Sequence, residues 1–422
     1  MCRCPVSTGR PDTGLATPSG RASETSRLCL SRFPSCHAAP TASSARSCAR
    51  SRRPTVPQVD SSARVSLLLA DRFRLCVIGP MLGTVPGWPI SQGEILGLRL
   101  ARDGHLVATA STRPGRVGRL LDMICTVLKH RRSTDVLVLQ VYSGLSFVVE
   151  DIVSLIASTL GIPVVMHLHG GGFPEFAARH RAWSSRVLGR GSVRVAPSRF
   201  LARVANGLDL TCRVIPNIID PGEYAFRERR HVRPRLFWMR TFHPIYEPEM
   251  AVRVLARVRE WAPDSTLVMA GAKGPVEASI RRMARKLGLD EAVRFPGYLD
   301  LPGKNREGGN ADIFLNTNQV DNTPVSVIEA CAMGLPVVTT DVGGIRDLLS
   351  HGETGLLVER GNDAEMADAV GRLCRDPELV SGLSRRGRAL SQRFSWTVAA
   401  EAWDDALRAA LSTADKGTRR VA

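Results

Sequence analysis

The chain has 422 residues, of which 44% are hydrophobic, and its formal net charge at pH 7 is +17. This length and apolar content are enough for two domains of ordinary size, each with a full core. A basic surface favours anionic ligands and anionic membrane surfaces. However, no zinc-finger, basic-zipper or RNA-binding motif is present, and only 5% of the residues are aromatic, so we expect no specific nucleic-acid binding.

The ten cysteines are scattered and include no C-x-x-C pair for zinc or redox chemistry. Those in the body of the chain, such as Cys76, Cys125 and Cys331, lie in apolar runs. They are typical of small core residues in a reducing compartment. No D-x-D motif lies between predicted strands and no histidines cluster, so we expect no metal and no cofactor.

Residues 1–70 are dominated by Ser, Arg, Pro, Thr and Ala without apolar periodicity, so they cannot bury enough surface to fold alone. We expect a disordered extension or a translation start placed too early. An organellar transit peptide, which is also Arg-rich and poor in acids, is a third interpretation. The apolar run at 65–70 is far too short to span a bilayer. We expect a cytoplasmic protein, with a peripheral position at the inner membrane face as an alternative.

The predicted first domain, residues 71–222, opens with an apolar strand that runs into a loop containing Gly83 and Gly87. These glycines let the backbone approach a ligand closely, although a plain structural turn is the alternative. The loop is not the dinucleotide motif G-x-G-x-x-G, and the next strand lacks the acidic residue that would hold an NAD ribose, which argues against a dehydrogenase. The expected elements are strand 73–80, strand 105–112, helix 116–130, strand 135–142, helix 147–160 and strand 163–170.

The run HLHGGG, residues 167–172, stands at the carboxyl end of a buried strand. A lone histidine is more often a core residue than a ligand. Because the strand end and the glycines place His169 where α/β sheets bind ligands, we interpret it as functional. We expect His167 to point to the opposite face of the strand and to pack in the core.

The predicted second domain, residues 233–393, follows an Arg- and Glu-rich linker. Residues 394–422 are expected to form an amphipathic final helix and a short polar tail. The expected elements of the second domain are strand 234–240, helix 248–260, strand 265–271, helix 275–288, strand 293–298 and strand 311–317.

The stretch 321–345 predicts a helix, a turn, a buried strand and a glycine loop. Pro324 suits the first turn of a helix, and Thr323 or Asn322 just before it can cap the free amides. A helix N-terminus suits a phosphate or diphosphate, because it presents free N–H groups and the positive end of the dipole. Further along, Glu329 can accept hydrogen bonds from vicinal sugar hydroxyls. An ordinary αβ unit of a doubly wound sheet is the alternative.

This stretch resembles the donor-binding signature of family 4 glycosyltransferases, which are retaining enzymes of the two-domain GT-B fold. The signature is Glu, seven residues, Glu-Ala, a short apolar segment, Gly and then Pro-Val-Val. Glu329, Gly334 and residues 336–338 match it in order, and Asp321 stands at the first position in place of Glu. Four further segments resemble motifs of the same family, namely residues 169–170, 214–220, 271–275 and 351–358.

The resemblance implies two Rossmann-like doubly wound parallel-sheet domains facing a cleft, with a final helix that crosses back to the first domain. It implies that Arg240 grips the diphosphate of a nucleoside-diphosphate sugar, that Glu329 binds the ribose, and that Asp321 binds the sugar from below. It places His169 beside the sugar, from the first domain. Further donor or acceptor contacts are implied for Pro324, Val325, Ser326, Gly271, Tyr298, Gly83 and Gly87.

The chain departs from the family at a second donor-binding cation. The family usually carries a Lys about five residues after the arginine, where this chain has Ile245 and Tyr246. Substitute cations would be Lys273 or Lys304, or a protonated histidine in the same loop, His243.

We therefore predict a retaining, metal-independent transfer of a hexose from a nucleoside-diphosphate sugar to a hydroxyl of a glycan, lipid or small-molecule acceptor. The lysine is missing, and Asp321 has a side chain one methylene shorter than the Glu of the signature. A non-catalytic donor-binding or partner protein is therefore an alternative. A sugar-nucleotide epimerase or hydrolase on the same fold is a further alternative. The base and sugar of the donor stay open.

Overall fold

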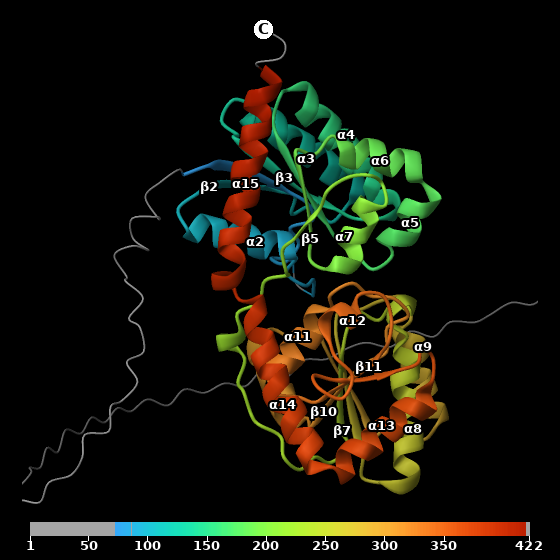
Figure 1. The fold of residues 1–422 in the computed structure, drawn as a ribbon. Helices are drawn as coiled ribbons and strands as arrows, with labels where there is room; N and C mark the ends of the chain where they lie inside the picture. Colours follow the sequence, from blue (N-terminus) through green and yellow to red (C-terminus); the bar gives the residue numbers. More distant parts are fainter. Residues whose placement is uncertain (1–71, 86, 419–422) are drawn as a thin grey trace, which may run out of the picture. The chain divides into compact units, whose positions relative to one another are not determined.

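The computed structural model describes residues 72–85 and 87–418. Within these ranges the chain forms two parallel β-sheets of six strands each, flanked by helices (Figure 1). The predicted α/β class with two doubly wound parallel sheets is thereby confirmed. The extension predicted for residues 1–70 lies outside the described residues.

The first sheet has the strand order β2-β1-β3-β4-β5-β6. From β1 the chain crosses to β2 on one side and then returns to form β3 on the other side. The order in which strands are added therefore changes direction between β1 and β3. In open α/β sheets, ligands bind outside the carboxyl ends of the strands at such a switch point. The strands are β1 (Arg74–Ile78), β2 (Leu106–Ala110), β3 (Val136–Val141), β4 (Val164–Leu168), β5 (Val193–Ala196) and β6 (Arg213–Val214).

Six helices in sequence order connect these strands. The helix predicted at 116–130 has those bounds in the structure, and the helix predicted at 147–160 ends one residue earlier. The helices are α2 (Gln92–Arg102), α3 (Arg116–His130), α4 (Phe147–Thr159), α5 (Phe173–Arg179), α6 (Arg181–Gly189) and α7 (Arg199–Asn206).

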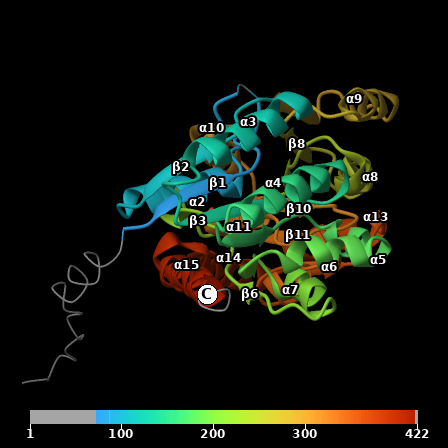
Figure 2. The same cartoon turned by 90° about the horizontal axis from the view of Figure 1, so that it is seen from above.

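Both faces of the first sheet are apolar, as the continuous hydrophobic runs of its strands predict. Alternate residues divide between two clusters: Leu137 and Leu139 of β3 pack with α3 and α4, whereas Val136 and Val138 pack on the other face. That other face is covered by α2 and by the last helix, α15 (Trp396–Thr418). Figure 2 shows α3 and α15 on opposite sides of β1 and β3.

The second sheet has the strand order β12-β11-β10-β7-β8-β9, with its switch point between β7 and β10. Its helices are α8 (Pro248–Trp261), α9 (Glu277–Lys286), α10 (Leu301–Asn310), α11 (Val325–Ala332), α12 (Ile345–Leu348), α13 (Asp363–Arg375) and α14 (Pro377–Ser391). Its strands are β7 (Arg235–Met239), β8 (Thr266–Ala270), β9 (Val293–Gly297), β10 (Ile313–Asn316), β11 (Val337–Thr340) and β12 (Leu356–Val358).

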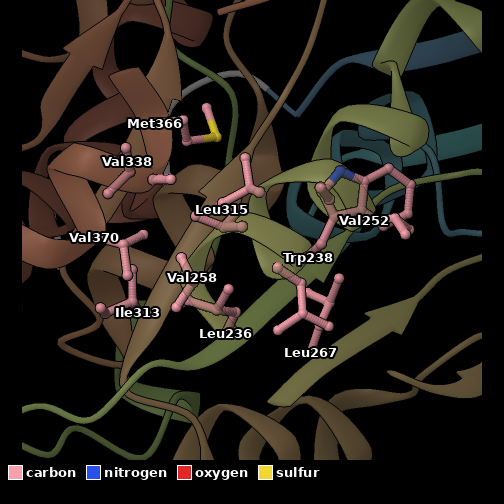
Figure 3. Packing of buried hydrophobic residues seen from close by; sticks show 14 of the residues in the cluster. Leu236, Trp238, Val252, Val258, Leu267, Ile313, Leu315, Val338, Met366 and Val370 are labelled. Atoms are coloured by element: carbon pink, nitrogen blue, oxygen red, sulfur yellow. The ribbon is translucent and has the colours of Figure 1, made fainter. Parts of the chain in front are cut away.

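The core of this second unit alternates in the same way. One face of the sheet packs against α8, α9 and α13, and the other against α10 and α11, while α14 contributes side chains to both clusters. Figure 3 shows part of the first of these clusters, with Leu236, Trp238 and Leu315 of the strands near Val252 and Met366 of the helices. These residues are fully or almost fully buried, so they hold the carboxyl ends of β7 and β10 in fixed positions.

Four short 3₁₀ turns complete the described chain, and one of them adjoins the candidate site. They are η1 (Gly144–Ser146), η2 (Pro221–Glu223), η3 (Pro244–Tyr246) and η4 (Gln392–Phe394). Among residues 72–85 and 87–418, no helix combines the length and the apolar character that crossing a bilayer requires.

Candidate donor-binding site

Arg240 and Asp321 meet across the switch point of the second sheet. Arg240 follows β7 and Asp321 follows β10, so two loops that are distant in sequence leave neighbouring strands at the same edge. The guanidinium Nη2 of Arg240 forms an ion pair with the Asp321 carboxylate, whose Oδ2 also accepts a hydrogen bond from the Asn318 amide. The side chains of Arg240 and Asp321 are only 15% and 10% exposed. The pair therefore places a largely buried fork of N–H donors at the switch point.

Tyr246 occupies the region in which the resemblance predicts a lysine. It ends the turn η3, and its ring lies under the Arg240 guanidinium, with 4.1 Å from the guanidinium carbon to the ring centroid. This cation–π contact restricts the arginine to one orientation. The Nε of Arg240 is buried and has no hydrogen-bond partner among the described residues. One N–H of the restrained guanidinium therefore has no acceptor in the described chain, although the protein covers the atom.

The start of α11 supplies a second group of donors. The predicted side-chain cap is wrong: Pro324 is the N-cap residue, and no side chain caps the helix. Thr323 and Asn322 are engaged elsewhere, because the Thr323 hydroxyl donates to Pro197 O at 3.4 Å and the Asn322 amide oxygen accepts from a serine hydroxyl of the first domain. With both candidate caps occupied, the amides at the start of the helix are left for another acceptor.

Val325 and Ser326 carry these uncapped amides. For the part of the chain that the structure describes, neither N–H has a hydrogen-bond partner. The Ser326 hydroxyl is also buried without a partner. Two amides and a hydroxyl at the positive end of a helix dipole form a site that suits an anion such as a phosphate.

Glu329 lies one turn further into α11 and is 5% exposed. Its Oε1 accepts a hydrogen bond from the Tyr224 hydroxyl at 2.8 Å and pairs with the Lys304 ammonium at 2.7 Å. This arrangement orients the carboxylate, and no sequence pattern predicts it because the partners lie 105 and 25 residues away. Lys304 is therefore paired with Glu329, the residue predicted to bind the ribose. Lys273, the other candidate cation, is exposed in the loop after β8.

Glycines let two pairs of loops approach each other closely around the ion pair. A Cβ on Gly271 would lie 1.8 Å from the carbonyl oxygen of Arg240, and the residue has a φ of +151°. A Cβ on Gly343 would lie 2.0 Å from the carbonyl oxygen of Asp321. Only glycine fits either position, so the loops after β8 and β11 hold the backbone that carries Arg240 and Asp321.

Tyr298 follows a strand of the second sheet, whereas Gly83 and Gly87 follow β1 of the first sheet. Tyr298 follows β9 and is 37% exposed, next to Gly297, whose carbonyl oxygen accepts the Gly271 N–H at 2.8 Å. In the first domain, the Gly83 N–H donates to Glu94 at 2.8 Å, which ties its loop to the start of α2. Gly87 has a φ of +82° and no atom near its missing Cβ. Their roles in ligand binding stay predictions.

His169 follows β4 in the first domain and is 7% exposed. Its ring stacks on Tyr142, with centroids 5.0 Å apart, and its Nε2 lies 2.7 Å from the side-chain oxygen of Gln140. Burial lowers the pKa of His169 to about 3, so the ring is neutral at physiological pH. A neutral ring accepts or donates a hydrogen bond without carrying charge to the site.

The prediction for His167 was half wrong. Its ring is 4% exposed and meets Trp403 of α15 edge-on, as a core residue would. It does not face away from His169, however, because the two ring centroids are only 4.1 Å apart. Residues two apart in a strand share a face, and the chain keeps that direction just beyond β4.

Contacts between the two domains bring the His169 loop to Asp321. A Cβ on Gly171 would lie 2.8 Å from the Asp321 Cα. Beside this contact, the Asn217 side-chain amide donates to the Thr323 carbonyl oxygen at 3.1 Å. Nothing in the sequence indicates this contact, because its two residues lie 106 positions apart. The start of α11 is thus held from the first domain.

Two adjacent glycines test whether this close approach matters. Gly171→Ala places a methyl group against the Asp321 backbone, which must move, and we expect donor turnover to fall about 10- to 100-fold because small displacements of reacting groups are costly. Gly172→Ala is the matched control, since its Cβ would meet only Ser143 Oγ at an ordinary 3.7 Å. Steady-state rates and melting temperatures of both variants decide the matter. Equal rates for the two variants would contradict the expectation.

The comparisons with known proteins agree with this geometry. Residues 228–390 match the model of the family described as Glycosyl transferases group 1. This segment, which is less than half of the chain, resembles a glycosyltransferase group 1 domain. It contains β7 to β12 and therefore Arg240, Asp321 and α11.

Among the described residues, no group of three or more His, Cys, Asp and Glu side chains is placed to hold a metal ion.

Curated relatives match about half of the chain. The phosphatidyl-myo-inositol mannosyltransferase of Mycobacterium leprae is 31% identical over 226 residues, which cover 52% of this chain and 59% of that protein. The D-inositol 3-phosphate glycosyltransferase of Kribbella flavida is 28% identical over 209 residues, 46% of this chain and 49% of that protein. The matched part thus spans between about half and two thirds of these relatives.

Solved structures resemble the whole described fold. The sucrose-phosphate synthase of Thermosynechococcus elongatus has a TM-score of 0.67 at 18% identity, over 81% of this chain and 100% of that one. Anabaena HepE in complex with UDP and glucose has a TM-score of 0.62 at 18% identity, over 79% of this chain and 99% of that one. Together with the two sheets, these neighbours confirm the predicted GT-B fold.

Proposed function

We propose that the protein is a retaining glycosyltransferase that moves a hexose from a nucleoside-diphosphate sugar to an acceptor hydroxyl. One observation carries the proposal: the Arg240 Nε–H and the amides at the uncapped start of α11 have no acceptor within the described chain, and they follow the neighbouring strands β7 and β10 at the switch point. A diphosphate needs this arrangement of donors. In support, HepE, which shares the fold, was solved with UDP and glucose.

In the proposed reaction, the bond between the anomeric carbon and the diphosphate oxygen breaks, and the acceptor oxygen bonds to that carbon. The leaving diphosphate gains negative charge, which Arg240 and the amides of Val325 and Ser326 stabilise. The proton of the acceptor hydroxyl leaves with the diphosphate. These donors are oriented before the substrate binds, so they need little reorganisation as charge develops.

Glu329 is proposed to hold the ribose through its remaining oxygen, Oε2. Tyr224 and Lys304 occupy Oε1, so the carboxylate has one defined orientation toward two neighbouring hydroxyls. Asp321 and His169 are proposed to enclose the sugar from the two domains, because the loop after His169 packs directly on Asp321. Enclosure excludes water and favours transfer over hydrolysis.

A thermal-shift screen of the full chain against UDP, GDP, ADP and dTDP and their sugars tests the donor site. A ligand that binds only the folded state adds about 2.7 kcal/mol at a hundredfold excess over its dissociation constant, which raises the melting temperature by several degrees. We expect one base to stand out. Glu329→Gln should abolish most of that shift, whereas Glu401→Gln, an exposed residue of α15, should not. If a well-folded chain shows no shift in melting temperature with any of these nucleotides or nucleotide sugars, the proposal is contradicted.

A non-catalytic donor-binding protein is the second candidate. It is favoured by the ion pair of Arg240 with Asp321 and by Tyr246 at the place of a second cation, which together reduce the positive charge available to a diphosphate. Product analysis separates the two candidates. Binding of a nucleotide sugar without release of free nucleotide, in the presence or absence of acceptors, would support this second candidate.

A further inference from the structure

Gln140 is a buried polar residue that the proposed reaction does not yet use. It lies on β3, is 2% exposed, and stands directly opposite His167 of β4 in the parallel register. Its side-chain oxygen lies 2.7 Å from Nε2 of His169. Burying an amide is costly unless it is hydrogen-bonded, so a glutamine at this position in an apolar sheet calls for an explanation.

The surrounding chain leaves space specifically for this side chain. A Cβ on Gly79, just after β1, would lie 2.5 Å from Gln140 Cγ. A Cβ on Gly93, in α2, would lie 2.8 Å from Gln140 Cδ. Two glycines from different elements thus form a slot that fixes the amide. Its nitrogen has no partner in the described chain, so the contact with His169 is the only hydrogen bond that orients it.

The contact determines which nitrogen of His169 carries the proton. A neutral imidazole has one N–H donor and one acceptor nitrogen, and the hydrogen bond made by one nitrogen sets the state of the other. An amide oxygen only accepts, so it selects the form with the proton on Nε2. The stacked ring of Tyr142, with an interplanar angle of 21°, keeps the imidazole from turning. The Nδ1 of His169 then carries a lone pair.

That lone pair is available to a ligand. Within residues 72–85 and 87–418, Nδ1 of His169 has no hydrogen-bond partner, and it is not among the nitrogens sealed from solvent. The Nδ1 of His167, in contrast, is buried and unpartnered. The two neighbouring histidines therefore differ: His167 is closed into the core, and His169 presents an acceptor atom.

We propose that Gln140 is a positioning residue that holds His169 as the Nε2–H tautomer, so that Nδ1 accepts a hydrogen bond from a hydroxyl of the donor sugar. This inference rests on the proposed function and adds a substrate class to it. A lone pair attracts a hydroxyl and repels a carboxylate. The site therefore selects neutral hexoses over uronic acids, and His169 does not act as a proton donor.

Nitrogen-15 NMR of the full chain tests the tautomer without any substrate. The His169 signals are assigned by their loss in His169→Gln. We expect one protonated nitrogen, Nε2, with no change between pH 5 and pH 8. Gln140→Leu should give a mixture of tautomers. Gln140→Glu, which keeps the shape of the side chain, should favour the charged ring and bring its titration into this range. An Nδ1–H tautomer in the unmodified chain would overturn the inference.

Kinetics with UDP-glucose and its uronic acid, UDP-glucuronate, test the consequence. We expect Gln140→Leu to lower kcat/KM for release of UDP from UDP-glucose about tenfold while leaving the dissociation constant of UDP unchanged, because UDP has no sugar to meet Nδ1. Gln140→Glu should narrow the preference for UDP-glucose over UDP-glucuronate. A variant that turns over like the unmodified chain would overturn the inference. If no nucleotide sugar reacts, the proposed function fails, and the NMR result still decides the tautomer.

Discussion

Replacing Arg240 with methionine is expected to lower kcat/KM for the donor by about 10²- to 10³-fold, the range seen when one preorganised charge-stabilising donor is removed. The guanidinium is positioned by Asp321 and Tyr246 before any ligand arrives. Its loss therefore removes an interaction that strengthens as the diphosphate leaves. Steady-state kinetics with saturating acceptor, or donor hydrolysis without acceptor, gives the measurement.

The same substitution leaves Asp321 as a buried carboxylate without its partner, which costs about 3–5 kcal/mol in stability. Unfolding alone would then lower activity, so a second variant is needed. Arg240→Met combined with Asp321→Asn removes both charges and should recover most of the stability but none of the activity. Recovery of both would show that Arg240 serves the fold and not the donor.

Replacing Glu150 with glutamine is expected to change the pH dependence of stability. Glu150 of α4 is 4% exposed, and desolvation raises its pKa to about 8. Its Oε1 accepts the Tyr142 N–H at 3.3 Å, whereas Oε2 is buried without a partner in the described chain. The folded protein therefore keeps a proton that the unfolded chain releases near pH 4.5.

Between these two pH values the unfolded state gains stability by ionising, and the folded state does not. The free energy of unfolding contributed by Glu150 thus falls as pH rises, by up to about 1.4 kcal/mol per pH unit. Below the unfolded pKa the penalty vanishes. Glu150→Gln cannot ionise, so we expect it to be more stable than the unmodified chain by a few kcal/mol at pH 8 and about equal to it near pH 4.5.

Urea denaturation of both proteins between pH 5 and pH 8 measures this difference. The comparison cancels the opposite contribution of buried histidines, whose lowered pKa values destabilise the fold in acid and are common to both chains. Glu401→Gln, in an exposed position of α15, should leave the pH profile unchanged. Parallel profiles for Glu150→Gln and the unmodified chain would show that Glu150 is ionised in the folded state.

The sequence predicted the features that repeat locally. Apolar runs predicted the buried strands, helical spacing predicted α3, and the spacing from Asp321 to Glu329 indicated a glycosyltransferase of the GT-B fold. These patterns depend on neighbours within a turn or a strand, so a single chain contains them. The sequence also placed Arg240 and Asp321 at strand ends, which is sufficient to bring them to one edge of a parallel sheet.

Features made by distant residues escaped prediction. The sequence around Glu329 does not predict its contacts with Tyr224 and Lys304. Likewise, the sequence around His169 does not predict its contact with Gln140. The missing helix cap had a similar cause, because Asn322 bonds to the first domain and not to its own helix. Such pairings follow from how two sheets are packed, and local propensities carry no information about that packing.

During synthesis, the strands of the first sheet are made well before α15, the helix that covers one of its faces. Trp403, Ala406 and Leu407 complete a face whose strands end near residue 214, about 190 residues earlier in the chain. At roughly 5–20 residues per second, the ribosome needs about 10–40 s to supply them. During that interval the apolar face that contains Val165 and Val195 lacks its cover from α15, which makes it a natural binding site for a chaperone.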